Sequence, residues 1–110
     1  MLWQIRYHNE SVQTAVLTLP PGLLARYLLC TDRMLEFGPD LGMPHTRAMG
    51  ASLFELRLKS SEGIGRVFYC TLAGQKIIML HQFVKKTNKT PPGELKIARQ
   101  RLKEWKNVDA

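Results

Sequence analysis

The feature that most restricts the fold is a change in hydrophobic period between the first and second halves of the chain. Up to Leu35, apolar residues recur at spacings of three and four, which is typical of amphipathic helices. From Leu53 onward, apolar and polar residues alternate, which is typical of strands with one buried face. The alternating set has Phe54, Leu56 and Leu58 on one face and Glu55, Arg57 and Lys59 on the other. A chain of 110 residues buries one modest core, so we expect a single domain over residues 1–110.

Proline and glycine mark the boundaries of the predicted elements. We predict a strand over 2–7, helices over 10–19 and 23–37, a loop over 38–52, strands over 53–59, 64–72 and 75–84, and a helix capped by Thr90. The tight turn Pro20-Pro21-Gly22 makes the first two helices a helical hairpin. Residues 77–80 are apolar on both faces, which places the third strand of the meander in the centre of the sheet. The predicted class is α+β in the order β-α-α-β-β-β-α, with a twisted, mostly antiparallel sheet and a C-terminal helix.

Positive charge is concentrated in the last third of the chain. Sixteen Lys and Arg against nine Asp and Glu give a net charge of +7. Residues 76–110 hold nine basic and three acidic side chains, so they carry most of this excess. A one-sided positive field favours a polyanionic partner such as a nucleic acid, although a solvated basic helix has the same composition.

The sequence indicates neither a membrane nor a secreted protein. No run approaches the roughly 18 apolar residues that span a bilayer, and the first residues lack the basic-then-apolar order of a secretory signal. Two cysteines, Cys30 and Cys70, do not make a disulfide framework. We therefore expect a cytoplasmic protein with no membrane partner.

Standard catalytic motifs do not occur in the sequence. His8, His45 and His81 are scattered singly, and no cysteine or histidine spacing fits a metal site. There is also no GxxxxGK[ST] loop for a nucleotide. We predict neither a metal nor a cofactor.

Cationic side chains on the predicted strands are the remaining candidates. They are either ordinary surface charge or a phosphate-binding floor on one sheet face, with the helices covering the opposite face. Arg66 is ambiguous because it shares its face with apolar residues. A buried arginine needs a partner, so Arg66 is either paired, with Glu55 or Glu62, or functional.

Three segments carry a more specific signal. They are Leu53-Phe54-Glu55-Leu56-Arg57, then Gly65-Arg66-Val67-Phe68-Tyr69, and then residues 77–91, with the sequence IIMLHQFVKKTNKTP. Their order and spacing are close to the pattern LxELR … RVxY … LLHxFxKKTxKTP. This pattern resembles the RelE/ParE toxin superfamily, and most closely its phage-derived HigB-like branch of type II toxin–antitoxin systems. The resemblance covers nearly the whole chain and is strongest over 53–101.

The resemblance implies a RelE-like fold and a ribosome-dependent mRNA endoribonuclease that halts translation. It also implies a cognate helix-turn-helix antitoxin, with operator DNA bound only through the toxin–antitoxin complex. In such enzymes a ribose 2′-OH attacks the adjacent phosphate, without a metal or cofactor. This chemistry needs proton transfers and stabilisation of a pentavalent anion.

The resemblance and the chemistry together assign the candidate residues. The catalytic candidates are Arg57 and Arg66 for the phosphate, and His81, Lys85 and Lys86 for the proton transfers. The candidates for nucleic-acid binding are Lys59, Phe83, Lys89, Arg99 and Lys103, with the Phe83 ring either stacking on a base or packing in the core.

Two alternatives stay open at this point. One is a ParE-like toxin that inhibits DNA gyrase, although such proteins tend to lack the concentrated basic residues. The other is a non-catalytic module that acts as a corepressor with its antitoxin.

Overall fold

A computed structural model describes residues 2–85 and 89–109 of the chain. In chain order, the elements are β1 (Gln4–Tyr7), α1 (Glu10–Leu17), α2 (Pro21–Phe37), β2 (Thr46–Gly50), β3 (Leu53–Ser60), β4 (Gly63–Leu72), β5 (Lys76–Lys85) and α3 (Pro92–Asp109). The strands form one sheet in the order β1-β5-β4-β3-β2, with β1 parallel to β5 and the other pairs antiparallel. The mixed α+β class is therefore confirmed.

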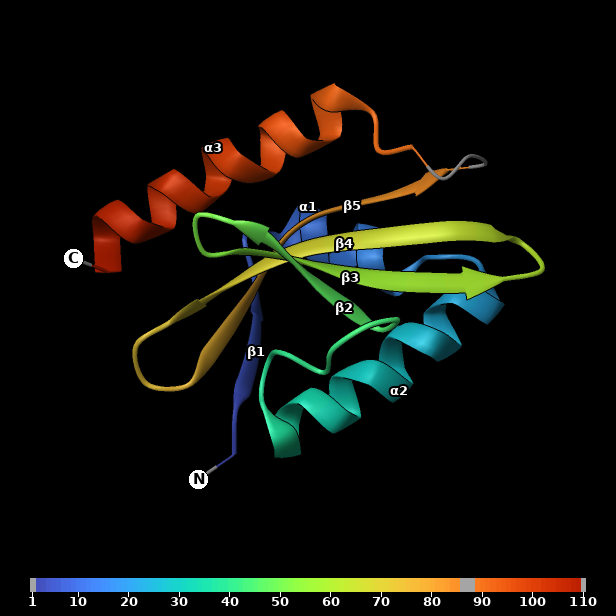
Figure 1. Ribbon diagram of the computed structural model, residues 1–110, viewed down its shortest axis with the longest axis horizontal. Coiled ribbons are helices and arrows are strands. Elements are labelled where there is room, and N and C mark those ends of the chain that lie inside the picture. The colour runs from blue at the N-terminus through green and yellow to red at the C-terminus, as the bar shows by residue number, and fades with distance from the viewer. Residues whose placement is uncertain (1, 86–88, 110) are drawn as a thin grey trace.

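Helices cover both faces of the sheet (Figure 1). On one face, α1 and α2 enclose a core in which Leu23 and Tyr27 pack on Leu56, Val67 and Met79. On the other face, α3 closes a second core around Phe68, Ile78 and Leu80. Strand β5 contributes alternate side chains to both cores, which confirms its predicted central position.

Local signals fix the ends of the first two helices. The side chain of Asn9 accepts a hydrogen bond from the Val12 N–H at 2.8 Å and so caps α1. Gly38 ends α2 with φ +96°, a backbone conformation that side chains disfavour. The helices predicted over 10–19 and 23–37 are both present, with α1 ending two residues earlier and α2 beginning two residues earlier than predicted.

The structure corrects the predicted order at one element. Residues 46–50 form an additional edge strand, β2, in the region predicted to be a loop. Its five residues end in Gly50 and show no apolar–polar alternation, so this short strand is defined by its pairing with β3. The order is therefore β-α-α-β-β-β-β-α.

The structure also corrects two predicted packing arrangements. Helices α1 and α2 meet at a bend of 114° instead of lying side by side as a hairpin, because α1 packs on β5 and α2 packs mainly on β3. In addition, α3 lies on the sheet face that carries the strand cations, not on the opposite face. Among the described residues, no single helix has the length and hydropathy to cross a membrane, and only the bent pair α1 and α2 reaches these values when joined.

Candidate active site

Three adjacent rows of side chains cross the sheet on the face that α3 partly covers. In an antiparallel sheet, directly opposite residues project from the same face. The pairing of β3, β4 and β5 gives the rows Lys59, Ile64 and Lys85; Arg57, Arg66 and Phe83; and Glu55, Phe68 and His81. We call these nine residues the three-row site. The fold thus brings six of the sequence-predicted residues together, from strands far apart in the chain.

A β-bulge in β5 brings the residues of this strand onto the site face. Tyr69 pairs with Met79, but the residue before it on β4, Phe68, pairs with His81. Leu80 is therefore an extra residue on β5. After the extra residue, the alternation of β5 is reversed. As a result, Phe83 and not Gln82 lies opposite Arg66. The sequence pattern gives no signal for this bulge.

A buried carboxylate holds the two arginines of the middle row. Oε1 of Glu55 lies 2.9 Å from Nη1 of Arg57 and 3.7 Å from Nε of Arg66. Glu55 is only 2% exposed, so it is removed from water. Of the two partners considered for Arg66, the structure has Glu55, whereas Glu62 accepts a hydrogen bond from the Gly22 N–H.

Cations exceed anions in the three-row site. Its nine residues include four cations, Lys59, Arg57, Arg66 and Lys85, and one carboxylate, Glu55. Arg57 lies directly opposite Arg66, and like charges in this arrangement repel each other. An anionic ligand at this place would offset the excess charge, so the geometry suits a phosphate group.

Arg66 is the most deeply placed of these cations. It is 5% exposed, and its Nη1 donates to the carbonyls of Gly65 at 2.9 Å and Leu58 at 3.4 Å. Its Nε is buried and has no hydrogen-bond partner among the described residues. Burial, followed by the charge of Arg57, lowers the pKa of the Arg66 guanidinium. Its ordinary value is so high that the group still keeps its charge at neutral pH.

Lys85 lies in the neighbouring row, and its amine contacts the segment just before α3. It is 7% exposed, and its Nζ donates to Oγ1 of Thr90 at 3.3 Å. Burial and the nearby charge of Arg66 lower the pKa of the Lys85 amine. A lysine with a lowered pKa exchanges protons more readily near neutral pH.

His81 and Phe83 are both engaged by neighbouring residues. The His81 ring contacts the carboxylate of Glu94 through Nε2 and lies 3.5 Å from Nη1 of Arg101 through Nδ1. Phe83 is 8% exposed and packs against the rings of Phe68 and His81. These two side chains therefore lie between the core under α3 and the cations of the three-row site.

The remaining predicted residues lie outside the three rows. Arg99 on α3 donates to the carbonyls of Met49 at 2.9 Å and Gly50 at 3.3 Å, which ties the helix to β2. Lys89 and Lys103 are exposed. Lys86 lies outside the described residues.

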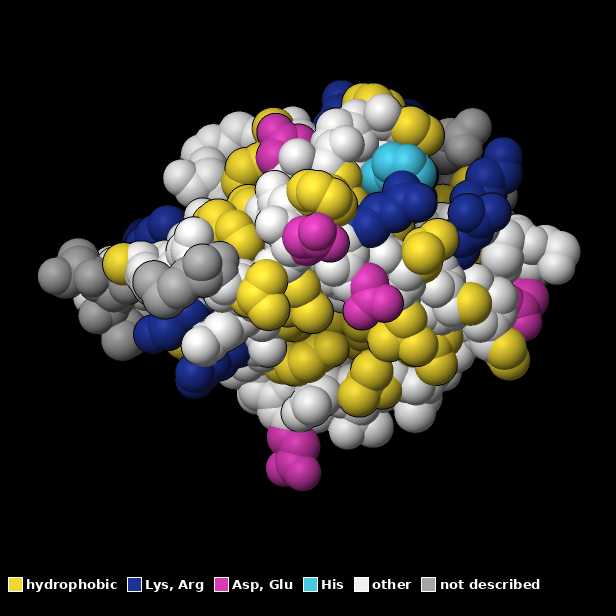
Figure 2. Space-filling model, turned by 90° about the horizontal axis from the view of Figure 1, so that it is seen from below, with side chains coloured by type: hydrophobic (Ala, Val, Ile, Leu, Met, Phe, Trp, Pro, Cys, Tyr) yellow, Lys and Arg dark blue, Asp and Glu magenta, His cyan; other side chains and the backbone are white. Residues whose placement is uncertain are grey.

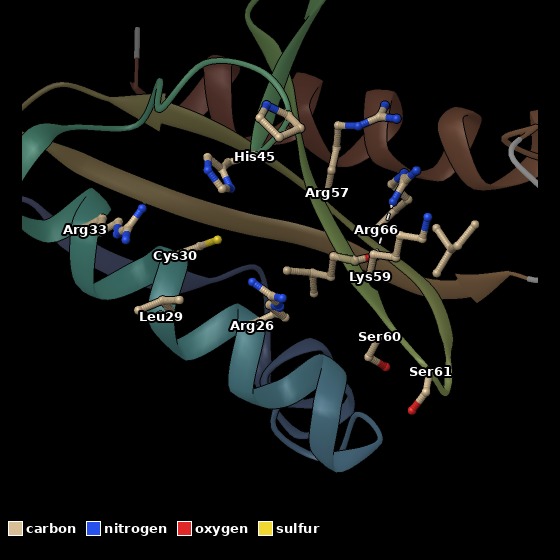
Figure 3. A pocket seen from close by; sticks show the side chains of 13 residues that line it. Arg26, Leu29, Cys30, Arg33, His45, Arg57, Lys59, Ser60, Ser61 and Arg66 are labelled. Carbon is tan, nitrogen blue, oxygen red and sulfur yellow. Dashed lines mark hydrogen bonds between the residues drawn. The ribbon is translucent and has the colours of Figure 1, made fainter.

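A cavity of about 690 Å³ joins the middle row to α2. Arg57 and Arg66 line it from the sheet, and Arg26, Arg33 and His45 line it from α2 and the loop before β2. In Figure 3, Arg26 and Arg33 project from α2, whereas Arg57 and Arg66 point away from that helix. Sequence reasoning missed these three added residues, although Arg26 and Arg33 are seven positions apart and so share a helix face.

Comparison with known proteins gives one family. A family model described as phage derived protein Gp49-like (DUF891) matches residues 15–103, which include the whole three-row site. A search of curated proteins finds no match.

Proposed function

Because the chain belongs to the Gp49-like family, a family of RelE/HigB-like toxins of toxin–antitoxin systems, we propose that it is a ribosome-dependent mRNA endoribonuclease. The observation that carries this proposal is the pairing of Arg57 and Arg66 around one buried carboxylate. In this proposal, their excess positive charge binds the scissile phosphate. The family implies an antitoxin partner, and we propose that it is a helix-turn-helix protein.

In the proposed reaction, the ribose 2′-oxygen attacks the adjacent phosphorus and the bond from phosphorus to the 5′-oxygen breaks. The products are a 2′,3′-cyclic phosphate and a 5′-hydroxyl. Charge accumulates on the phosphate oxygens in the transition state, and the fixed guanidinium groups of Arg57 and Arg66 would stabilise it. Losing one such electrostatic contact typically costs about 10²–10³ in rate.

The proton transfers are assigned first to Lys85. The proton of the 2′-OH would pass to the deprotonated form of the Lys85 amine, which burial favours by lowering its pKa, and the Lys85 ammonium would return a proton to the leaving 5′-oxygen. His81 is the second candidate, but its Nε2 contacts Glu94 and would have to release that carboxylate first. Lys86 remains a candidate by its place in the sequence alone.

The other cations are assigned to docking. Lys59 lies at the exposed edge of the site, and Lys89 and Lys103 are exposed toward solvent. We propose that these lysines contact ribosomal RNA or messenger RNA. Arg99 is a weaker candidate because both of its terminal nitrogens already bind carbonyls.

The test is Arg66→Gln, expressed without antitoxin and compared with wild type and with Arg6→Gln. Arg6 is exposed on β1, at the opposite edge of the sheet, so it is a matched charge-loss control. We expect Arg66→Gln to lose growth arrest and codon-phased mRNA cuts in primer extension, and Arg6→Gln to keep both. Arg57→Gln, at a side chain that is 27% exposed, should show the same loss with less risk to folding.

Three outcomes would contradict the proposal. Folded arginine variants that still cut mRNA would remove these residues from the reaction. Gyrase-dependent DNA breaks with intact mRNA would indicate a ParE-like toxin, and harmless overexpression of the wild type would indicate a corepressor.

A further inference from the structure

The cavity beside α2 opens where the edge of the sheet is left uncovered. Strand β2 pairs only with the first half of β3, with Thr46 opposite Leu56. Beyond this point, residues 57–60 of β3 line the cavity together with α2. Leu58, on the α2 side of β3, and Arg57, on the other side, both line it, so the cavity passes around the edge of the strand.

The walls of this cavity are cationic on both sides. Its Lys and Arg side chains are Arg26 and Arg33 from α2 and Arg57, Lys59 and Arg66 from the sheet. No Asp or Glu is among the described residues that line it. The face of the molecule below the sheet also shows Lys and Arg gathered beside a histidine, at one side of an apolar area (Figure 2). The cavity therefore favours an anion with several charges.

A contact outside the cavity holds its two walls together. Oε1 of Glu62, in the turn between β3 and β4, accepts a hydrogen bond of 2.6 Å from the N–H of Gly22 in the first turn of α2. Ser60 Oγ lies 3.3 Å from the same carboxylate oxygen. The spacing between α2 and the edge of β3 is thus set by bonded groups and does not depend on a ligand.

We propose that Arg26 and Arg33 bind phosphates of the RNA strand that flank the bond cut at Arg57 and Arg66. This inference rests on the proposed function. Arg26 and Arg33 lie seven positions apart on α2, a rise of about 10 Å, so the two groups bind different phosphates. His45, in the loop before β2, lines the same cavity.

The cavity favours RNA over an acidic protein segment for two reasons. It is continuous with Arg57 and Arg66, so a strand held at these residues must pass through or beside it. Its lining also includes the apolar residues Leu29, Pro44 and Ile64, and bases can pack on such surfaces while their phosphates contact the arginines.

The test measures binding of a 12-nucleotide single-stranded RNA whose 2′-hydroxyls are all methylated, so that it cannot be cut. Fluorescence anisotropy compares wild type, Arg26→Gln/Arg33→Gln and the matched control Arg6→Gln at 50 and 200 mM salt. Both α2 arginines are exposed, so their loss should leave the fold intact. Two lost phosphate contacts reduce the salt slope by about 1.4, and the affinity advantage of wild type should therefore shrink about sevenfold between these salt concentrations.

Each result supports or overturns the inference separately from the proposed function. A salt slope for Arg26→Gln/Arg33→Gln equal to that of Arg6→Gln overturns it, even where Arg66→Gln still abolishes mRNA cutting. A reduced slope supports the binding of RNA phosphates by Arg26 and Arg33, even where the wild type fails to cut mRNA and the proposed function is wrong. Binding of a 12-residue poly-glutamate peptide in preference to the RNA, lost in the double variant, assigns the cavity to a protein and also overturns the inference.

Discussion

Replacing Glu55 with Gln should destabilise the protein far more than a surface charge change, because this carboxylate compensates two arginines. The Glu55 oxygen lies 3.7 Å from Nε of Arg66, and both side chains are buried. With an effective dielectric constant of about 20, a charge pair at this distance is worth about 4 kcal/mol. Glutamine keeps the shape and one acceptor oxygen, so no cavity forms. We expect the free energy of unfolding to fall by about 3–5 kcal/mol, the usual cost of breaking a buried pair.

Urea unfolding followed by circular dichroism measures this change. Glu36→Gln, at an exposed position on α2, is the control and should stay within about 0.5 kcal/mol of wild type. In Glu55→Gln/Arg66→Met the surplus charge is removed with its partner, so part of the lost stability should return. A loss below about 1 kcal/mol in Glu55→Gln would refute the view that this carboxylate holds the arginines in place.

Two other predictions concern single groups. The pKa of Lys85 is lowered in the folded state by burial and by Arg66, so the unfolded chain binds more protons between that lowered pKa and the ordinary lysine value. The free energy of unfolding should therefore rise with pH across this window, and Lys85→Met should flatten the rise in urea titrations at several pH values; an unchanged slope would show that Lys85 is not its source. Asn9→Ala removes the cap of α1 and should lower the free energy of unfolding by about 1 kcal/mol in the same assay. An unchanged free energy of unfolding would mean that water replaces the cap.

The sequence contains enough information to place Arg57 opposite Arg66. Strands β3 and β4 are joined by a two-residue turn, Ser61 and Glu62, so Ser60 faces Gly63. Counting back along both strands from this turn puts Arg57 opposite Arg66. The alternation of β3 gives the correct faces as well, and Glu55 was one of two predicted partners for Arg66.

Features that depend on contacts between distant segments could not be predicted in this way. Strand β2 exists through its pairing with β3, and its own five residues carry no periodic pattern. The cavity beside α2 depends on the contact between Glu62 and Gly22, forty residues apart. No local pattern encodes such a distance, so Arg26 and Arg33 did not stand out as site residues.

The bulge at Leu80 explains how one strand serves both a core and a charged site. Before it, Ile78 projects into the α3 core on the site face. In a regular strand, Gln82 and Val84 would follow Ile78 on that face, and Lys85 would lie on the other side. The extra residue reverses the alternation, so that Phe83 and Lys85 lie opposite Arg66 and Ile64. The site face therefore changes from apolar to cationic along a single strand, and the excess positive charge is collected at the end of the sheet where α2 adds two more arginines.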